Sequence, residues 1–275
     1  MPAIDYRRQT ILITGASSGI GESFARALAA RGSDLVLVAR RRARLEALAT
    51  ELERSHGVTA TVISQDLGSS SAGADLSAAT AAAGLRVTGI INNAGFGSFG
   101  DFVDEDADLF AREIAVDISA PVQISGAFLP GMVAEGEGFL INVASMSAYV
   151  PTPRMAVYGA AKAFILSFTE SLWAETRASG VTVFALSPGA TETEFNTVVG
   201  TDDATSRARM RAADDVVLTA LAHLQRRYPG PSVIDGTSNK LSANIGRVLS
   251  RRRTAELMHR ITDPTRRRTP RSASA

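Results

Sequence analysis

Short apolar runs alternate with longer amphipathic or alanine-rich segments along most of the chain. Runs such as TILIT at 10–14 and DLVLVA at 34–39 are apolar at nearly every position, which is typical of strands buried on both faces of a parallel sheet. The segments between such runs have the length and periodicity of helices. The predicted strands cover 10–14, 34–39, 58–64, 87–93, 138–145, 181–187 and 231–235, and the predicted helices cover 19–32, 42–56, 69–84, 106–135, 155–179 and 213–227.

This alternation predicts an α/β fold with a doubly wound parallel sheet of the Rossmann type, in a single domain over 1–262. The regularity weakens after Phe195. We expect 196–212 to form a mobile helical flap over the substrate and 238–262 to form a C-terminal helical extension. The last residues, 263–275, lack large apolar side chains and are predicted to be a disordered basic tail.

Composition narrows the class of protein further. The chain has 275 residues, 45% of them hydrophobic, and a net charge of +1, which is typical of a globular domain with one large core. The absence of cysteine excludes a disulfide scaffold, a thiolate metal site and a cysteine nucleophile. The three histidines are far apart and lack metal-ligand spacing, so no metal site is expected. No apolar run has the length of a membrane span, and the first residues lack a secretory signal, which favours the cytoplasm.

Positive charge gathers near the C-terminus, where residues 247–271 contain nine arginines. A protein that binds nucleic acid or an acidic membrane surface would use such a stripe. This charge lies outside the predicted core of the fold, so we expect no nucleic acid partner and no membrane span.

A glycine-rich segment, TGASSGIG at 14–21, follows the first predicted strand and opens the first helix. The spacing of Gly15, Gly19 and Gly21 lets the backbone turn sharply, approach a phosphate and direct helix-start N–H groups at the anion. This spacing differs from the better-known G-x-G-x-x-G pattern. A tight turn with only a structural role is therefore the alternative.

The second predicted strand ends in a run of arginines rather than in an acid. A carboxylate at this point would accept hydrogen bonds from an adenosine ribose, whereas arginine suits a 2′-phosphate. Here Arg40 and Arg41 stand where the acid would be. We assign the phosphate contact to Arg40 and interpret Arg42 and Arg44 as the solvated start of a helix.

Tyr158 and Lys162 lie four residues apart on a predicted helix and therefore share one face. An isolated tyrosine titrates near pH ~10, which is too high for ready proton exchange at neutral pH. A cation about 4 Å away, at an effective dielectric constant of about 20, contributes up to about 4 kcal/mol before desolvation is counted. Lys162 is therefore predicted to bring the pKa of the Tyr158 phenol close to neutrality, although this pair of residues is also common by chance.

Together, these motifs have the order and spacing of the short-chain dehydrogenase/reductase family, which the sequence resembles over about residues 8–195 and more weakly to 262. The family's catalytic serine, tyrosine and lysine fall on Ser145, Tyr158 and Lys162. Its glycine motif matches Thr14, Gly15, Gly19, Ile20 and Gly21, its Asn-Asn-Ala-Gly motif matches Asn92 to Gly95 with Ala94 between them, and its remaining cofactor contacts match Asp66, Pro188, Gly189 and Thr193. Ser17, Ser18 and Ile20 line the glycine turn, and we expect them to touch the phosphates. The alternative for the two serines is that they satisfy helix-start N–H groups.

The resemblance implies an oxidoreductase that uses NADP(H), with NAD(H) less favoured, to interconvert a carbonyl and its alcohol. Tyr158 would exchange a proton with the substrate oxygen, Ser145 would polarise that oxygen, and Lys162 would bind the nicotinamide ribose. Apolar residues that would line the pocket favour a hydrophobic ketone, namely Phe96, Met146, Val150 and Met155. The alternative is that these four residues belong to the core. The segment GTSNKL and the Arg-rich end resemble bacterial broad-range ketone or alcohol reductases, and family habit implies a homodimer or homotetramer.

One position departs from the family pattern, because Asp117 stands where the family has a catalytic asparagine. The aspartate is either a tolerated near-isostere or the sign of an altered proton relay. This departure keeps a second function open, in which the protein is a nucleotide-binding sensor or interaction protein on the same fold without efficient turnover.

Overall fold

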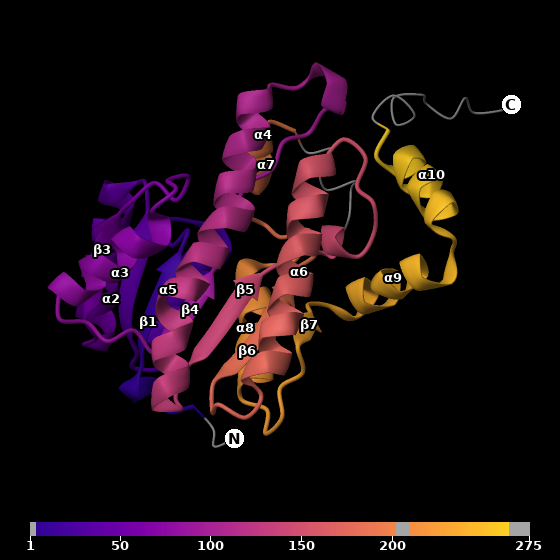
Figure 1. The fold of residues 1–275 in the computed structure, drawn as a ribbon. Helices are drawn as coiled ribbons and strands as arrows, with labels where there is room; N and C mark the ends of the chain where they lie inside the picture. Colours follow the sequence, from indigo (N-terminus) through magenta and orange to yellow (C-terminus); the bar gives the residue numbers. More distant parts are fainter. Residues whose placement is uncertain (1–3, 202–209, 264–275) are drawn as a thin grey trace, which may run out of the picture.

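The computed structural model describes residues 4–201 and 210–263, and their strands form one seven-stranded parallel sheet. The strand order is β3-β2-β1-β4-β5-β6-β7, and helices cover both faces (Figure 1). The predicted doubly wound α/β fold is therefore confirmed. The strands are β1 (Thr10–Thr14), β2 (Asp34–Ala39), β3 (Ala60–Ser64), β4 (Gly89–Asn92), β5 (Phe139–Val143), β6 (Thr182–Ser187) and β7 (Ser232–Ile234).

Two layers of hydrophobic core lie on the two faces of the sheet. Alternate side chains of a strand point to opposite faces, so Ile11 and Ile13 of β1 belong to one cluster and Leu12 to the other. Phe24 lies in the first cluster and Leu76 in the second. The first is covered by α1 (Gly19–Ala29), α2 (Arg42–His56) and α8 (Ala213–Leu224), and the second by α3 (Ala72–Ala82), α5 (Ala120–Glu135) and α6 (Ala156–Thr176).

The long helix predicted over 106–135 consists of three consecutive segments. A π-helical turn, η3 (Ala115–Ser119), lies between α4 (Ala107–Ile114) and α5. The Ala120 N–H donates to the Ala115 carbonyl, five residues back, as in a π-helix. Pro121 follows and has no N–H with which to restore the α-helical bond to the Asp117 carbonyl. The wider turn thus occurs at the residue that departs from the family pattern.

The C-terminal part of the described chain extends away from the sheet beyond β7 (Figure 1). It contains α9 (Thr237–Val248) and α10 (Arg251–Ile261), whereas α7 (Phe195–Val199) follows β6. Arg154, in the loop before α6, donates to the His259 carbonyl at 3.3 Å and to Thr262 Oγ1 at 3.2 Å, which anchors the end of α10. Residues 202–209 of the predicted flap, and 264–275 of the predicted tail, lie outside the described residues.

Candidate active site

The candidate site lies at the edge of the sheet where the parallel strands end. β1 and β4 are neighbours in the sheet, but the chain proceeds from β1 toward β3 and from β4 toward β7. Such a reversal of direction opens a crevice at the carboxyl ends of the strands, where ligands bind in open α/β sheets. Loops at this edge and the first turn of α1 carry the predicted residues Gly15, Ser17, Ser18, Gly19, Ile20, Gly21, Arg40, Asp66, Ala94, Gly95, Ser145, Pro188 and Gly189.

The glycine turn after β1 is packed tightly against neighbouring loops. Gly15 and Gly19 have φ values of +67° and +56°, which favour glycine. A Cβ on Gly15 would lie 2.8 Å from Asn93 Nδ2, and a Cβ on Gly19 would lie 2.9 Å from Thr193 Cγ2. Thr14 Oγ1 accepts a hydrogen bond from the Asn93 N–H at 2.9 Å, which joins the turn to the loop after β4. This bare backbone at the start of α1 fits the phosphates of a dinucleotide.

Asn92, which the sequence places among the cofactor contacts, faces the protein interior. Its Nδ2 donates to Asn142 Oδ1 at 2.8 Å, and Asn142 Nδ2 donates to Thr169 Oγ1 at 2.8 Å. The three side chains are buried and link β4, β5 and α6. The geometry therefore gives Asn92 a structural contact, and its neighbour Asn93 holds the glycine turn.

Asp66 and Pro188 lie on opposite sides of the crevice. Asp66 follows β3, is exposed, and accepts a hydrogen bond from the Gly68 N–H at 3.0 Å. Pro188 follows β6, and its carbonyl accepts from the Met146 N–H at 2.9 Å, which joins the loops after β5 and β6. These contacts fix the loops on which Asp66, Pro188 and Gly189 are held.

Ser145, Tyr158 and Lys162 converge at the end of β5. Ser145 follows β5 within two residues, and its Oγ accepts a hydrogen bond from the Ser147 N–H at 3.1 Å. Tyr158 and Lys162 lie one turn apart on α6, and Lys162 Nζ is 5.5 Å from the centre of the Tyr158 ring. A hydrogen bond between Ser145 and Tyr158 favours a lower pKa of the phenol. The three side chains that the sequence singled out thus lie together.

Lys162 forms a buried ion pair with Asp117. Its Nζ lies 2.9 Å from Asp117 Oδ1 and donates to the Val143 carbonyl at 3.2 Å, while Asp117 Oδ2 accepts from the Phe96 N–H at 3.0 Å. Burial raises the pKa of Asp117, and the ion pair offsets only part of this effect. Burial alone would lower the pKa of Lys162, but the Asp117 carboxylate and Tyr158 raise it above its ordinary value. The π turn thus places an acid beside the lysine that the sequence predicts to be catalytic.

A second acid near this pair, Glu113, was not anticipated from the sequence. It lies on α4, is fully buried, and its Oε2 accepts a hydrogen bond from Ser98 Oγ at 3.0 Å. Burial raises the pKa of Glu113 to about 7, and the charge of Asp117 adds to this rise. Its spacing of four residues from Asp117 is the sequence signal that would have found it.

The sequence-based expectation for the tyrosine pKa is wrong in its direction. Burial raises the pKa of Tyr158 above its ordinary value. Lys162 lowers it, but the carboxylates of Asp117 and Glu113 raise it again. One ammonium therefore does not outweigh burial and two neighbouring acids, and the phenol stays protonated at neutral pH.

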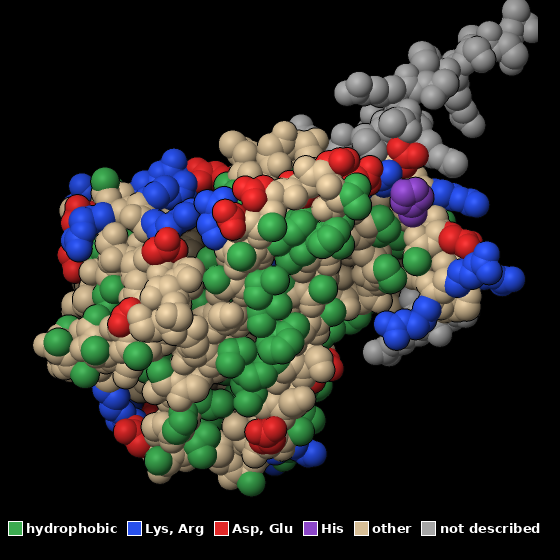
Figure 2. All heavy atoms as spheres, turned by 45° about the horizontal axis from the view of Figure 1, so that its top comes forward, with side chains coloured by type: hydrophobic (Ala, Val, Ile, Leu, Met, Phe, Trp, Pro, Cys, Tyr) green, Lys and Arg blue, Asp and Glu red, His purple; other side chains and the backbone are tan. Residues whose placement is uncertain are grey.

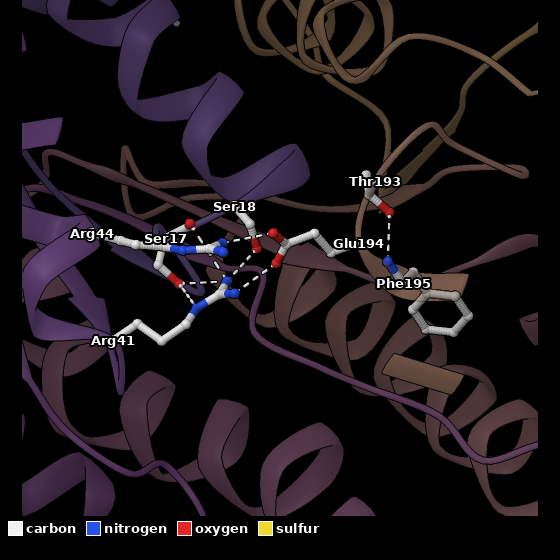
Figure 3. Close-up of polar contacts among 7 residues, drawn as sticks. All are labelled: Ser17, Ser18, Arg41, Arg44, Thr193, Glu194 and Phe195. Carbon is white, nitrogen blue, oxygen red and sulfur yellow. Dashed lines mark hydrogen bonds and ion pairs between the residues drawn. The ribbon is translucent and has the colours of Figure 1, made fainter. Parts of the chain in front are cut away.

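At the other end of the crevice, the structure places Arg41 rather than Arg40 against the glycine turn. Arg41 Nη2 donates to Ser17 Oγ at 3.0 Å and to Ser18 Oγ at 2.7 Å (Figure 3), whereas among the described residues no hydrogen bond joins the Arg40 side chain to the turn. Arg41 immediately precedes α2 with φ and ψ of −85° and 78°, and its guanidinium reaches back to the turn. Sequence proximity alone did not distinguish these two adjacent arginines.

Glu194 joins Arg41 to Arg44. Its two carboxylate oxygens each lie 2.6 Å from one guanidinium, Oε2 from Arg41 Nη1 and Oε1 from Arg44 Nη1 (Figure 3). The interpretation of Arg44 as only a solvated helix start is therefore incomplete. The ring of the next residue, Phe195, lies 5.3 Å from the Tyr158 ring between centres. The short segment around Glu194 thus spans from the glycine turn to the tyrosine.

The predicted pocket residues surround the tyrosine only in part. The backbone of Gly97 lies against Met155 and Tyr158, since a Cβ there would be 3.1 Å from atoms of both. Met155 is buried in this contact, whereas Phe96, Met146 and Val150 are partly exposed. The described residues contain no cluster of three His, Cys, Asp or Glu side chains suited to a metal ion. Nor do they form a helix both long and apolar enough to cross a membrane.

Comparison with known proteins identifies the family. The model of the short chain dehydrogenase family matches residues 9–204, and the chain belongs to this family. A short chain dehydrogenase of Pseudocercospora fijiensis is 35% identical over 217 residues, which cover 78% of this chain but only 65% of that relative. The alignment thus spans less than two thirds of that relative's length.

Solved structures agree with this assignment. A short-chain dehydrogenase from Sphingobium yanoikuyae in complex with NADPH is 34% identical, with a TM-score of 0.76, and the match covers 97% of this chain and 98% of that chain. The bulky-bulky ketone specific alcohol dehydrogenase from Comamonas testosteroni is 28% identical, with a TM-score of 0.73, and the match covers 98% of both chains. The family resemblance read from the sequence is confirmed.

Proposed function

We propose that this protein is an NADP(H)-dependent oxidoreductase that interconverts a hydrophobic ketone and its alcohol. The observation that carries the proposal is the position of Tyr158 beside both Ser145 and Lys162 at the end of β5. The bound cofactor would supply or accept the hydride. The residues that would hold it are those of the glycine turn from Gly15 to Gly21, together with Arg40, Arg41, Asp66, Lys162, Gly189 and Thr193.

Three side chains would carry out the proton chemistry. Ser145 would donate a hydrogen bond to the substrate oxygen and polarise the carbonyl. Tyr158 would donate its phenolic proton to the same oxygen during reduction. Because burial and nearby acids raise the pKa of Tyr158, the phenol is protonated at neutral pH. The site therefore favours reduction over oxidation under these conditions.

The cofactor preference in this proposal follows from charge at the end of β2. The guanidinium groups of Arg41 and Arg44 both face the Glu194 carboxylate beside the glycine turn. Arg40, the residue before Arg41, adds a third positive charge. Guanidinium groups suit the 2′-phosphate that distinguishes NADP(H) from NAD(H). The relative from Sphingobium yanoikuyae, whose structure contains NADPH, supports this preference.

The substrate class follows from the apolar side chains around Tyr158. Phe195 lies against the tyrosine ring, and Met155 lies beside it. Apolar walls bind a hydrophobic ketone by excluding water from it. The relative from Comamonas testosteroni is named for bulky ketones, which supports a large substrate.

We also propose that the enzyme is a homodimer or homotetramer. Figure 2 shows hydrophobic side chains gathered in a band across the middle of one face of the molecule. Among the exposed large hydrophobic residues are Ile114 of α4, Val133 of α5 and Phe164 of α6. Apolar surface of this kind is typical of contacts between subunits. Light scattering of the purified protein at several concentrations would test the proposal.

The function is tested by following NADPH absorbance with a panel of ketones of increasing size. We expect turnover with bulky aryl ketones and little with acetone, and loss of turnover in Tyr158→Phe by a factor on the order of 10² or more. Tyr149→Phe is the matched control, because its phenol lies 3.2 Å from Ser187 Oγ at the same sheet edge. Turnover retained in Tyr158→Phe would contradict the assignment of the proton donor.

A second function, a nucleotide-binding sensor without efficient turnover, is favoured by one observation. The acids Asp117 and Glu113 surround the catalytic lysine and raise the pKa of Tyr158. In that case, NADPH would bind to the native protein, but no ketone or alcohol would be converted. Restoration of turnover by Asp117→Asn would then identify the acid as the cause.

A further inference from the structure

Two arginines next to the glycine turn form a cationic site, and a carboxylate of the same chain occupies it. Glu194 accepts from Arg41 with one oxygen and from Arg44 with the other, each at 2.6 Å (Figure 3). The remaining donors of Arg41 face Ser17 and Ser18. The carboxylate thus takes the donors that an incoming anion would need.

Charge makes joint occupancy of this site unfavourable. The neighbouring guanidinium groups lower the pKa of Glu194 to about 2, so the carboxylate is ionised at neutral pH. A phosphate monoester carries about −1.5 to −2 at pH 7. Two anions that share Arg41 and Arg44 would repel each other. In addition, the N–H donors of Arg41 Nη1 are too few to bind both the carboxylate and a phosphate.

We propose that Glu194 is an intramolecular competitor of the cofactor's 2′-phosphate for Arg41 and Arg44, and thereby limits the preference for NADP(H) over NAD(H). This inference rests on the proposed function, because it assumes that the 2′-phosphate binds beside the glycine turn. Glu194 must leave the two arginines when the phosphorylated cofactor binds. The unphosphorylated cofactor has no group for this site and leaves the ion pairs in place.

The exposure of the three side chains indicates the size of the effect. Arg41, Arg44 and Glu194 are 43%, 52% and 41% exposed. Ion pairs as exposed as these are weak and exchange readily with other anions. Removal of the competing carboxylate should therefore strengthen NADPH binding by roughly three- to tenfold, the range that two exposed ion pairs represent.

The test compares the dissociation constants of NADPH and NADH for the native protein, E194Q and E46Q. Glu46 is the matched control, because it forms an exposed ion pair with Arg42 at 3.1 Å on the same helix, α2, away from the glycine turn. We expect E194Q to tighten NADPH binding roughly three- to tenfold and to leave NADH binding within about twofold. E46Q should change neither constant. A second variant, E194A, should act in the same direction as E194Q.

The outcomes separate the inference from the proposed function. Unchanged or weaker NADPH binding in E194Q, in a native protein that prefers NADPH, would overturn the competition and leave the cofactor assignment intact. Equal tightening of NADPH and NADH would also overturn it, because the effect would not depend on the 2′-phosphate. If neither the native protein nor E194Q binds NADPH more tightly than NADH, both the inference and the cofactor assignment are wrong.

Discussion

Two clusters of acid and base lie at the same edge of the sheet, but they differ in their exposure to water. Lys162 and Asp117 are 2.9 Å apart, with side chains that are 6% and 0% exposed. Arg41 and Glu194 are 2.6 Å apart, with side chains that are 43% and 41% exposed. In low dielectric surroundings, a charge is strongly held by its partner, whereas water screens an exposed pair. Similar distances therefore correspond to a fixed pair in one cluster and an exchangeable pair in the other.

The clusters also differ in the sign of their excess charge. In the buried cluster, Asp117 and Glu113 face one lysine, and these acids add to the rise in the pKa of Tyr158 that burial causes. In the exposed cluster, two arginines face Glu194, and the excess of base attracts an anion. One cluster is thus suited to holding a proton on a phenol and the other to binding a phosphate.

The largest effect is expected when the cation of the buried cluster is removed. Removal of a cation from the exposed cluster serves as the control. Lys162→Met leaves the Asp117 carboxylate buried without its cation, which we expect to lower the free energy of unfolding by about 3 kcal/mol. Arg41→Met removes a cation from an exposed pair and should lower it by less than about 1 kcal/mol. Urea unfolding of both variants at neutral pH measures the difference. Equal losses would contradict the contrast drawn from exposure.

The next effect concerns cofactor choice and distinguishes the roles of Arg41 and Arg40 at the exposed cluster. Arg41→Ala should weaken NADPH binding by about tenfold, which is about 1.4 kcal/mol, and should leave NADH binding nearly unchanged. Arg40→Ala should have a smaller effect, because it is the Arg41 guanidinium that contacts Ser17 and Ser18 of the turn. Titration calorimetry with both cofactors distinguishes the two arginines. A larger loss in Arg40→Ala would restore the assignment made from the sequence.

A third prediction removes the charge of the buried acid without changing its shape. Asp117 raises the pKa of Tyr158, so Asp117→Asn should lower that pKa and increase the fraction of phenolate. Alcohol oxidation needs the phenolate, and its pH profile should therefore move to lower pH. Ketone reduction at neutral pH should change only modestly, because the phenol is still largely protonated. Superimposable oxidation profiles of the two proteins would refute the charge argument.

The smallest expected effect concerns Glu113 and is read from stability rather than from activity. Burial raises the pKa of Glu113 from 4.5 to about 7, so the folded state binds more protons than the unfolded state between these values. Stability is therefore lost as the pH rises through this window. Glu113→Gln should raise Tm by several degrees at about pH 8.5 and by much less at about pH 5. The same increase at both pH values would exclude ionisation as the cause.

The strands of the sheet were predicted well because each strand is specified by a short, local run of residues. The bounds predicted for β1 and β2 match the observed ones, since each strand is an apolar run between turn residues. The π turn was not predicted, because an apolar pattern fits an α-helix and a helix with one wider turn equally well. The turn depends on Pro121 and on packing around Asp117, which the pattern does not encode.

The residues of the candidate site also fall into two groups, those that a local motif predicts and those that only the fold brings together. Tyr158, Lys162 and the glycine turn were predicted because each is a compact motif. Glu194 was missed because it reaches Arg41 across 153 positions of the chain, a distance over which spacing carries no signal. The choice between Arg40 and Arg41 depends on backbone angles at the start of α2. Contacts of this kind follow from the fold and not from the order of neighbouring residues.

The π turn at Ala115–Ser119 also has an evolutionary consequence. A π turn contains one residue more than the α-helical turn that it replaces. Deletion of a single codon within it would remove the extra residue and rotate α4 by about 100° relative to α5. Glu113 would then leave the side of the helix that faces the lysine, and Asp117 would stay with α5. A length change of one codon thus decides whether this helix brings one acid or two to Lys162.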